Sequence, residues 1–291
     1  MKEVRATIYL FLTSVIWGVS FVAQVVGMDF MRPFTFNGVT FLIGAVSLAP
    51  VIAFLDKKGS GVRGQGAVWR SGLICGIILF CAANFQQFGV ELTGSAGKSG
   101  FITGLYIIIV PLAGIFMKQK AGLLTWIGAV LAAAGMYFLC VQEGFGRLLP
   151  GDWLLFVCAF FWAAHIIAID KFAPHVNPLR LSQAQFFICG GLCLICALFT
   201  ETIVPANLLL AAAPLLYRGL GSIGLAYTLQ IFGQRHVAPA NASVIFSLES
   251  VFSVVGGAIL ISEIMTPRAY LGCALIFAGI ILSQLRPKKL A

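Results

Sequence analysis

Three ionisable side chains stand inside long apolar stretches of this sequence, at Glu249, Arg218 and His165. Charged groups in apolar surroundings are costly, so they usually face a cavity or a partner. Glu249 could relay a proton or anchor a substrate amine, or it could join helices as a hydrogen-bonded acid. Arg218 could bind a carboxylate or pair with Glu249 across one cavity, or extend its guanidinium to the edge of the apolar stretch. His165 fits a neutral hydrogen bond between helices or a pH-linked role.

Amide side chains recur in the same kind of stretch. Asn84, Gln86 and Gln87 lie close together, and Gln230 repeats Gln86 later in the chain. Buried amides either join helices or bind the polar, neutral parts of a metabolite. Lys98 begins another apolar stretch, either as an interfacial lysine or as a guide for anions at the mouth of a cavity.

Aromatic residues at Trp17, Tyr106, Trp162 and Tyr227 are candidates for the wall of that cavity, with apolar packing as the alternative. The eight cysteines all fall in apolar segments, where thiols behave as small hydrophobes, so we predict no disulfides. Three of them share one helix face, at Cys189, Cys193 and Cys196, but no His or Met cluster supports a soft-metal site there. We predict no catalytic residue, no metal, no cofactor and no nucleic acid partner.

The composition indicates which elements position these residues. Hydrophobic residues make up 60% of the 291 residues, charged residues only 10%, and the mean hydropathy is +0.99. A soluble domain needs about a quarter charged residues, so most of this surface must face lipid. A spanning helix needs about 20 apolar residues. We expect an all-α polytopic membrane protein with about ten helices, over residues 4–27, 33–55, 68–92, 98–117, 121–142, 152–171, 178–200, 210–234, 240–262 and 267–286.

The basic residues between these helices predict the orientation. When the connections are assigned alternately, 14 Lys and Arg residues fall on the side of the N-terminus and 4 on the other, with Arg218 inside a helix. Positive charge favours the cytoplasmic side. We therefore expect a multi-pass protein of the cytoplasmic membrane with both termini in the cytoplasm.

The sequence also repeats itself. At an offset of 144 residues Gln86 meets Gln230 and Gly128 meets Gly272, and at 145 Trp17 meets Trp162. Residues 1–145 and 146–291 are therefore predicted to be two five-helix repeats. Because five is odd, the second repeat is inverted relative to the first. Inverted repeats are typical of secondary transporters, with the substrate between the halves near the midplane.

Several motifs resemble one family. The run Ser247-Leu248-Glu249-Ser250-Val251-Phe252, then Gly256-Gly257 and Ser262-Glu263, resembles the pattern of the EamA family in the drug/metabolite transporter superfamily. The segment from Ala96 to Leu105, followed by Val110-Pro111, resembles the counterpart of this pattern in the first half of the family. The run Trp17-Gly18-Val19-Ser20-Phe21 resembles the family signature of the first helix.

The sequence departs from the pattern at two places. Ser250 replaces the usual proline, which puts a kink after Glu249 in doubt, and Gln119 stands where the second repeat has Glu263. The resemblance implies ten helices around a central cavity and movement of small metabolites, often amino acids and often outward.

The leading hypothesis is therefore a secondary active transporter, an exporter of an amino acid-like or other small polar or amphipathic solute, working by alternating access. Proton coupling is possible, and the sequence does not distinguish a monomer from a homodimer. No Walker motif appears, so ATP hydrolysis is not expected. The alternatives are a membrane-embedded enzyme acting on lipids or prenyl groups and a non-transporting membrane scaffold.

Overall fold

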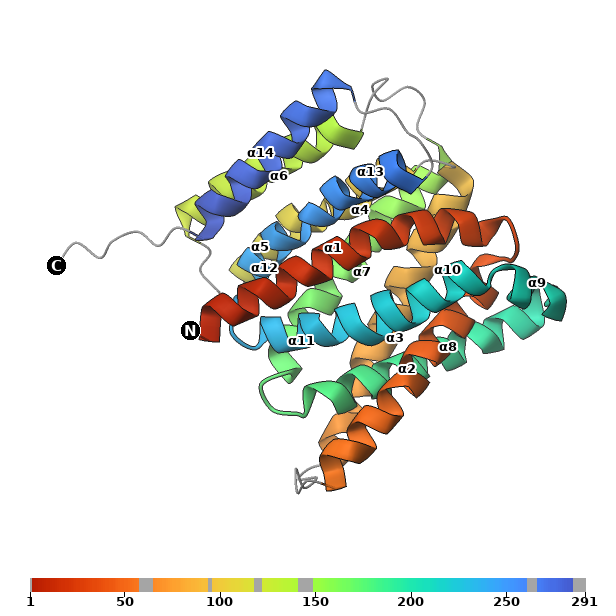
Figure 1. The fold of residues 1–291 in the computed structure, drawn as a ribbon. Helices are drawn as coiled ribbons and strands as arrows, with labels where there is room; N and C mark the ends of the chain where they lie inside the picture. Colours follow the sequence, from red (N-terminus) through yellow and green to blue (C-terminus); the bar gives the residue numbers. More distant parts are fainter. Residues whose placement is uncertain are drawn as a thin grey trace.

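A computed structural model describes residues 2–57, 65–93, 96–117, 122–140, 149–260 and 266–284. Every regular element among them is a helix (Figure 1). In chain order these are α1 (Lys2–Met28), α2 (Pro33–Lys57), α3 (Gln65–Thr93), α4 (Ala96–Gly104), α5 (Tyr106–Phe116), α6 (Leu123–Cys140), α7 (Pro150–Phe172), α8 (Pro178–Thr200), α9 (Pro205–Leu210), α10 (Ala212–Leu216), η1 (Tyr217–Tyr227), α11 (Thr228–Gln234), α12 (Pro239–Phe246), α13 (Leu248–Leu260) and α14 (Pro267–Gln284).

Seven stretches among the described residues are long and apolar enough to cross a membrane, with α4–α5 and α12–α13 each counting as one stretch. Two shorter apolar helices cover Leu123–Phe138 and Tyr270–Ser283. The all-α, multi-spanning class predicted from composition is therefore confirmed. The count of ten, the inverted repeat and the cytoplasmic termini stay predictions.

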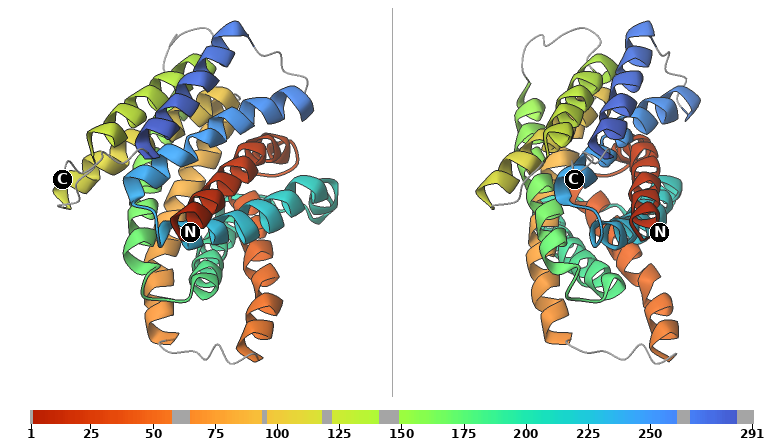
Figure 2. Two further views of the ribbon diagram at one scale, coloured as in Figure 1. Left: turned by 60° about the vertical axis from the view of Figure 1, so that its left-hand side comes forward. Right: turned by 90° about the vertical axis from the view of Figure 1, so that its left-hand side faces the viewer.

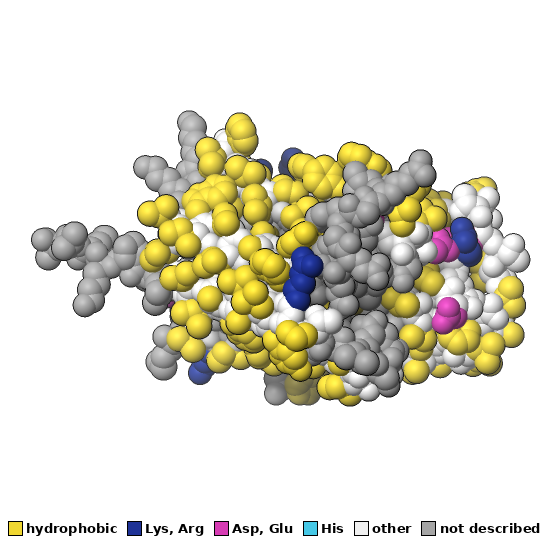
Figure 3. Space-filling model, turned by 90° about the horizontal axis from the view of Figure 1, so that it is seen from above, with side chains coloured by type: hydrophobic (Ala, Val, Ile, Leu, Met, Phe, Trp, Pro, Cys, Tyr) yellow, Lys and Arg dark blue, Asp and Glu magenta, His cyan; other side chains and the backbone are white. Residues whose placement is uncertain are grey.

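The surface is apolar where a soluble protein would be charged. Phe116 is 88% exposed, Phe199 85% and Leu209 82%. Figure 3 shows one face, on which hydrophobic side chains dominate and charged ones are few. Exposed aromatic and aliphatic side chains at this density are stable only against an apolar solvent such as lipid.

Two of the expected helices are interrupted, at places that differ by two residues when the halves are aligned at the offset of 144. The segment predicted as one helix over 98–117 divides at Leu105 into α4 and α5, and the segment over 240–262 divides at Ser247 into α12 and α13. The Ser247 hydroxyl donates to the Val244 carbonyl at 2.6 Å. This bond competes with helical pairing of the backbone, so the helix breaks although Ser250 replaces the proline.

The segment predicted as one helix over 210–234 is also irregular. It begins at Pro205 and contains the π-helix η1, flanked by α10 and α11. A π-helix is rare and is frequently found at functional sites. Arg218 and Tyr227 both lie on η1.

Helices far apart in sequence pack as pairs. α6 lies along α14, α3 along α7, α2 along α8 and α1 along α13 (Figures 1 and 2). Glycines allow the closest of these contacts, because a Cβ added at Gly128 or at Gly279 would come within 2.5 Å of the other's carbonyl oxygen.

Polar contacts join the helices at both ends of the bundle. Opposite the N-terminus, Glu201 accepts hydrogen bonds from the backbone N–H groups of Phe34 and Thr35, both at 2.8 Å, at the start of α2. On the side of the N-terminus, Arg180 at the start of α8 pairs with Asp56 at the end of α2 at 2.5 Å. These contacts connect α2 to α8 at its two ends.

Candidate functional site

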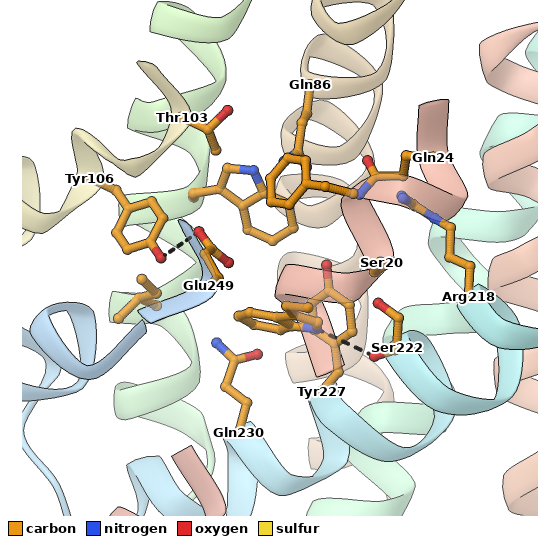
Figure 4. Close-up of a pocket in the computed structure, with 14 residues that line it drawn as sticks. Ser20, Gln24, Gln86, Thr103, Tyr106, Arg218, Ser222, Tyr227, Gln230 and Glu249 are labelled. Carbon is orange, nitrogen blue, oxygen red and sulfur yellow. Dashed lines mark hydrogen bonds between the residues drawn. The ribbon is translucent and has the colours of Figure 1, made fainter. Parts of the chain in front are cut away.

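A pocket opens among α1, α3, α4, α5, α7, η1, α11 and α13, with about 490 Å³ of empty space that includes open solvent at its mouth. Side chains from both halves of the chain surround it (Figure 4). They are Trp17, Ser20, Phe21, Gln24, Gln86, Thr103, Tyr106, Trp162, Ile166, Arg218, Ser222, Tyr227, Gln230 and Glu249.

α1 supplies one wall through helical spacing. Trp17, Ser20, Phe21 and Gln24 follow one another at intervals that place them on a single helix face. The opposite faces of α1 carry apolar residues for packing. α1 therefore presents both an aromatic and a polar surface to the pocket.

Aromatic rings gather at the centre. The ring centroids of Trp17 and Tyr227 are 4.7 Å apart, and those of Trp17 and Trp162 are 6.3 Å apart. The Trp17 indole N–H donates a long hydrogen bond, at 3.4 Å, to the Ser222 carbonyl of η1. The rings give the pocket an apolar wall that is fixed in orientation.

Glu249 stands at one end of the pocket, 5% exposed and in the first turn of α13. Its carboxylate accepts a hydrogen bond from the Tyr106 hydroxyl at 2.9 Å, which is its only such bond to the described residues. The start of a helix carries partial positive charge, so this position favours a negative group.

Arg218 stands on the other side of the pocket, 4% exposed (Figure 4). One guanidinium nitrogen donates to Asn37 Oδ1 at 3.0 Å, and the group lies over the Phe36 ring, 5.3 Å from its centroid. Within the described chain no carboxylate forms an ion pair with it, Glu249 included. The guanidinium of Arg218 and the carboxyl group of Glu249 therefore share one pocket without an ion pair between them.

Eight of the residues singled out from the sequence line this pocket: Trp17, Gln86, Tyr106, Trp162, Arg218, Tyr227, Gln230 and Glu249. Asn84 and Gln87 do not, because they lie three residues apart on a different face of α3 from Gln86. Gln87 donates to the Gln24 carbonyl at 3.3 Å, and Asn84 binds Asn37. The side chain of Lys98 lies outside the described residues.

His165 lies behind the aromatic wall. It is fully buried, and its Nε2 is 3.0 Å from Gln185 Oε1 of α8. Its ring contacts Trp162 and Tyr227, with centroids 5.9 and 6.1 Å away. This geometry matches the alternative in which a histidine joins helices.

Several polar residues of the pocket were not predicted from the sequence. Ser20 and Gln24 follow Trp17 at helical spacing, and Ser222 follows Arg218 by four residues, so a face-by-face search would have found them. Thr103 precedes Tyr106 by three residues, so the same spacing locates it. Asn37, which binds Arg218 but does not line the pocket, carries no such signal.

Comparisons with known proteins agree with this architecture. The EamA-like transporter family matches the chain twice, over residues 4–141 and 149–285. An uncharacterized transporter of Archaeoglobus fulgidus is 31% identical, covering 98% of this chain and 88% of the relative. Uncharacterized transporter YwfM of Bacillus subtilis is 25% identical, covering 99% of this chain and 97% of the relative. One protein of known crystal structure shares the fold, with a TM-score of 0.79 at 20% identity, covering 96% of each chain.

Proposed function

The chain belongs to the EamA-like transporter family, and on that premise we propose that it is a secondary active transporter. It exports a small amino acid-like metabolite across the cytoplasmic membrane by alternating access. The observation that carries this proposal is the placing of Arg218 and Glu249 in one buried pocket without an ion pair between them.

The side chains that line the pocket suit a small solute with two opposite charges. Arg218 suits a carboxylate, because a guanidinium presents paired N–H donors to two oxygens. Glu249 suits an ammonium group. Between them the rings of Trp17, Trp162 and Tyr227 suit an apolar side chain.

Packing at matched positions supports the inverted repeat. A Cβ added at Gly89 in α3 would lie 2.5 Å from the Leu155 side chain and 3.2 Å from the Gly151 carbonyl. A Cβ at Gly233 in α11 would lie 2.5 Å from the Leu10 side chain and 3.1 Å from the Ala6 carbonyl. At the offsets of 144 and 145 found in the sequence, Gly89 corresponds to Gly233, Leu155 to Leu10, and Gly151 to Ala6. Such reciprocal contacts arise when two copies are related by a twofold axis.

The α6–α14 contact has the same character. A Cβ at Gly128 would meet the Gly279 carbonyl at 2.5 Å, and one at Gly135 would meet the Gly272 carbonyl at 2.6 Å. Gly128 is the counterpart of Gly272, and Gly135 of Gly279. The pairs run in opposite order along the two helices, so α6 and α14 are antiparallel. This supports two repeats over 1–145 and 146–291, the second inverted.

The connections support the proposed orientation. The α7–α8 and α11–α12 connections lie on the side of the N-terminus, and the α1–α2 and α8–α9 connections lie opposite (Figure 1). Lys171, Arg180 and Arg235 stand at the former. Positive residues on that side are expected to face the cytoplasm, together with both ends of the chain.

Glu249 also provides a route to proton coupling. Its carboxylate binds either a proton or a substrate ammonium group, and the two exclude each other. A proton entering from outside would release the substrate there, and substrate binding inside would release the proton. This exchange gives a proton antiporter without any second ion site.

Reconstitution into proteoliposomes tests the function. Vesicles holding the purified chain are loaded with unlabelled L-amino acids, and counterflow of each labelled amino acid is measured against empty vesicles. We expect accumulation of at least one amphipathic amino acid, and faster efflux when the exterior is acidified. No flux of any amino acid would contradict the proposal and favour an enzyme or a scaffold.

A further inference from the structure

The charge of Arg218 is held in place by neutral groups alone. Its described contacts are the Asn37 amide oxygen, at 3.0 Å, and the face of the Phe36 ring. Both residues lie on α2 and neither is exposed to solvent. A buried arginine normally has a carboxylate partner, because an isolated buried charge is costly. Arg218 lines the pocket instead, with Nε buried and unbonded.

Asn37 can accept from Arg218 in only one orientation of its amide. Its Nδ2 donates both hydrogens, to the Ala83 carbonyl at 3.1 Å and to Asn84 Oδ1 at 3.0 Å. Turning the amide over would place its oxygen against two acceptors and its NH₂ group against the guanidinium donors. The bonds to α3 therefore direct the oxygen toward Arg218.

Asn84 fixes the next link in the same way. Its Nδ2 donates to the Phe80 carbonyl at 2.7 Å and to Cys193 Sγ at 3.1 Å, which leaves Oδ1 for Asn37. The dipoles of the two amides are aligned from α3 to Arg218, and aligned hydrogen bonds strengthen one another in a low-dielectric interior. The relay joins α2, α3, α8 and η1.

We propose that Asn37 and Asn84 form a positioning relay that holds the Arg218 guanidinium without neutralising it, so that this side of the pocket is the subsite for the carboxylate of the substrate. The relay rests on the transport function proposed above, and it deepens it by assigning one substrate group to one side of the pocket. Asn37 and Asn84 act through Arg218 and need not touch the substrate.

The isosteric variant Asn37→Asp separates this role from a purely structural one. An aspartate at 37 keeps the size of the side chain but places a negative charge beside Arg218. The guanidinium then has an internal partner, and a substrate carboxylate loses its own. A merely structural defect would weaken every ligand alike, whereas cancelled charge weakens only ligands that carry a carboxylate.

Three probes of similar shape read out this difference. L-leucine carries both charged groups, 4-methylpentanoate lacks the amine and 3-methylbutylamine lacks the carboxylate. Binding of each is measured by calorimetry on the full chain in lipid nanodiscs. We expect Asn37→Asp to weaken L-leucine and 4-methylpentanoate by about tenfold or more, and to change 3-methylbutylamine by less than about twofold.

A second variant covers the case in which aspartate at 37 prevents folding. Asn84→Ala removes one acceptor of Asn37 and leaves its bond to the Ala83 carbonyl, so the two carboxylate probes should weaken by about two- to tenfold. Asn207→Asp is the matched control. Asn207 donates to the Phe30 carbonyl at 2.6 Å and does not line the pocket. It should leave all three affinities unchanged.

The possible outcomes separate the relay from the transport function. The relay is overturned if Asn37→Asp and Asn84→Ala weaken all three probes equally. It is also overturned if the affinities for L-leucine and 4-methylpentanoate, the two carboxylate probes, do not change. A wild-type chain that binds neither carboxylate probe overturns the subsite. If the carboxylate probes bind and Asn37→Asp weakens them, yet no labelled L-leucine crosses proteoliposome membranes, the relay stands and transport of that solute is wrong.

Discussion

The Tyr106 hydroxyl donates to the Glu249 carboxylate at 2.9 Å, and this bond joins the two interruptions in the broken helices. Tyr106 is the first residue of α5, directly after the break at Leu105, and Glu249 is the second residue of α13, just after the break at Ser247. The two residues that form this hydrogen bond inside the pocket therefore lie just after the two breaks. Any movement of α5 against α13 must lengthen or break it.

Tyr106→Phe should destabilise the protein, because it leaves a buried carboxylate without its donor. The expected cost is about 1–3 kcal/mol, measured as a lower unfolding temperature in detergent. Tyr217→Phe is the control, since Tyr217 donates to the Ile16 carbonyl at 3.0 Å, a neutral acceptor. If the Tyr217 variant is as unstable as the Tyr106 variant, the carboxylate has no special requirement for the bond.

Glu249→Gln should weaken probes that carry an amine and spare those that do not. L-leucine and 3-methylbutylamine lose their negative partner, so each should bind about tenfold more weakly, while 4-methylpentanoate is unchanged. In the wild-type chain acidification protonates Glu249 and removes the same partner, so affinity for 3-methylbutylamine should fall as pH falls. The variant should show no such dependence. A pH dependence that survives in Glu249→Gln would assign the proton to another group.

Gly89→Ala and Gly233→Ala should destabilise the protein by similar amounts, because the two added Cβ atoms would meet equivalent groups. Each would lie 2.5 Å from a leucine side chain and 3.1–3.2 Å from a backbone carbonyl. Overpacking of this kind costs about 1–3 kcal/mol. Gly66→Ala is the matched control, because a Cβ there meets nothing within 4 Å. Unfolding temperatures of the three variants check this, and a large loss in only one of the first two would argue against equivalent packing.

Glu201→Gln should loosen the end of the bundle opposite the N-terminus. The carboxylate accepts from two backbone N–H groups and from the Thr35 hydroxyl at 2.6 Å. An amide has one acceptor oxygen, and its NH₂ group would face a donor, so the expected loss is about 1–2 kcal/mol. Glu91→Gln, which breaks a pair with the 61% exposed side chain of Arg32, should cost under about 1 kcal/mol. Hydrogen exchange at the start of α2 would report the difference.

The all-helical, multi-spanning class could be predicted from the sequence, because lipid imposes long apolar segments. The breaks at Leu105 and Ser247 could not, since leucine and serine do not forbid a helix and the missing proline at 250 argued against a kink. The start of the eighth predicted segment was missed for a similar reason. Pro205 begins a short helix inside what reads as a connection.

The pocket was predictable where residues differ most from their surroundings. Glu249 and Arg218 are conspicuous in apolar runs, and both line it. Asn37 is not conspicuous, because one amide in an apolar helix usually only joins helices. Its importance depends on three bonds to partners 46 to 181 residues away, which no local pattern encodes.

On the repeat proposed above, the π-helix η1 contains one residue more than its counterpart in α3. Gly76 packs against Ile188 and the Gln185 carbonyl, and Gly219 against their counterparts Ile43 and the Thr40 carbonyl. These two glycines are 143 residues apart, whereas Ala82 and Ala226, further along, are 144 apart. The second copy thus has one more residue between 219 and 226, inside η1, and a π turn is the form in which a helix absorbs a single insertion. In the repeat proposed above, this one residue makes Tyr217–Tyr227 a π-helix where the matching part of α3 is an α-helix, so the two sides of the pocket differ in backbone geometry.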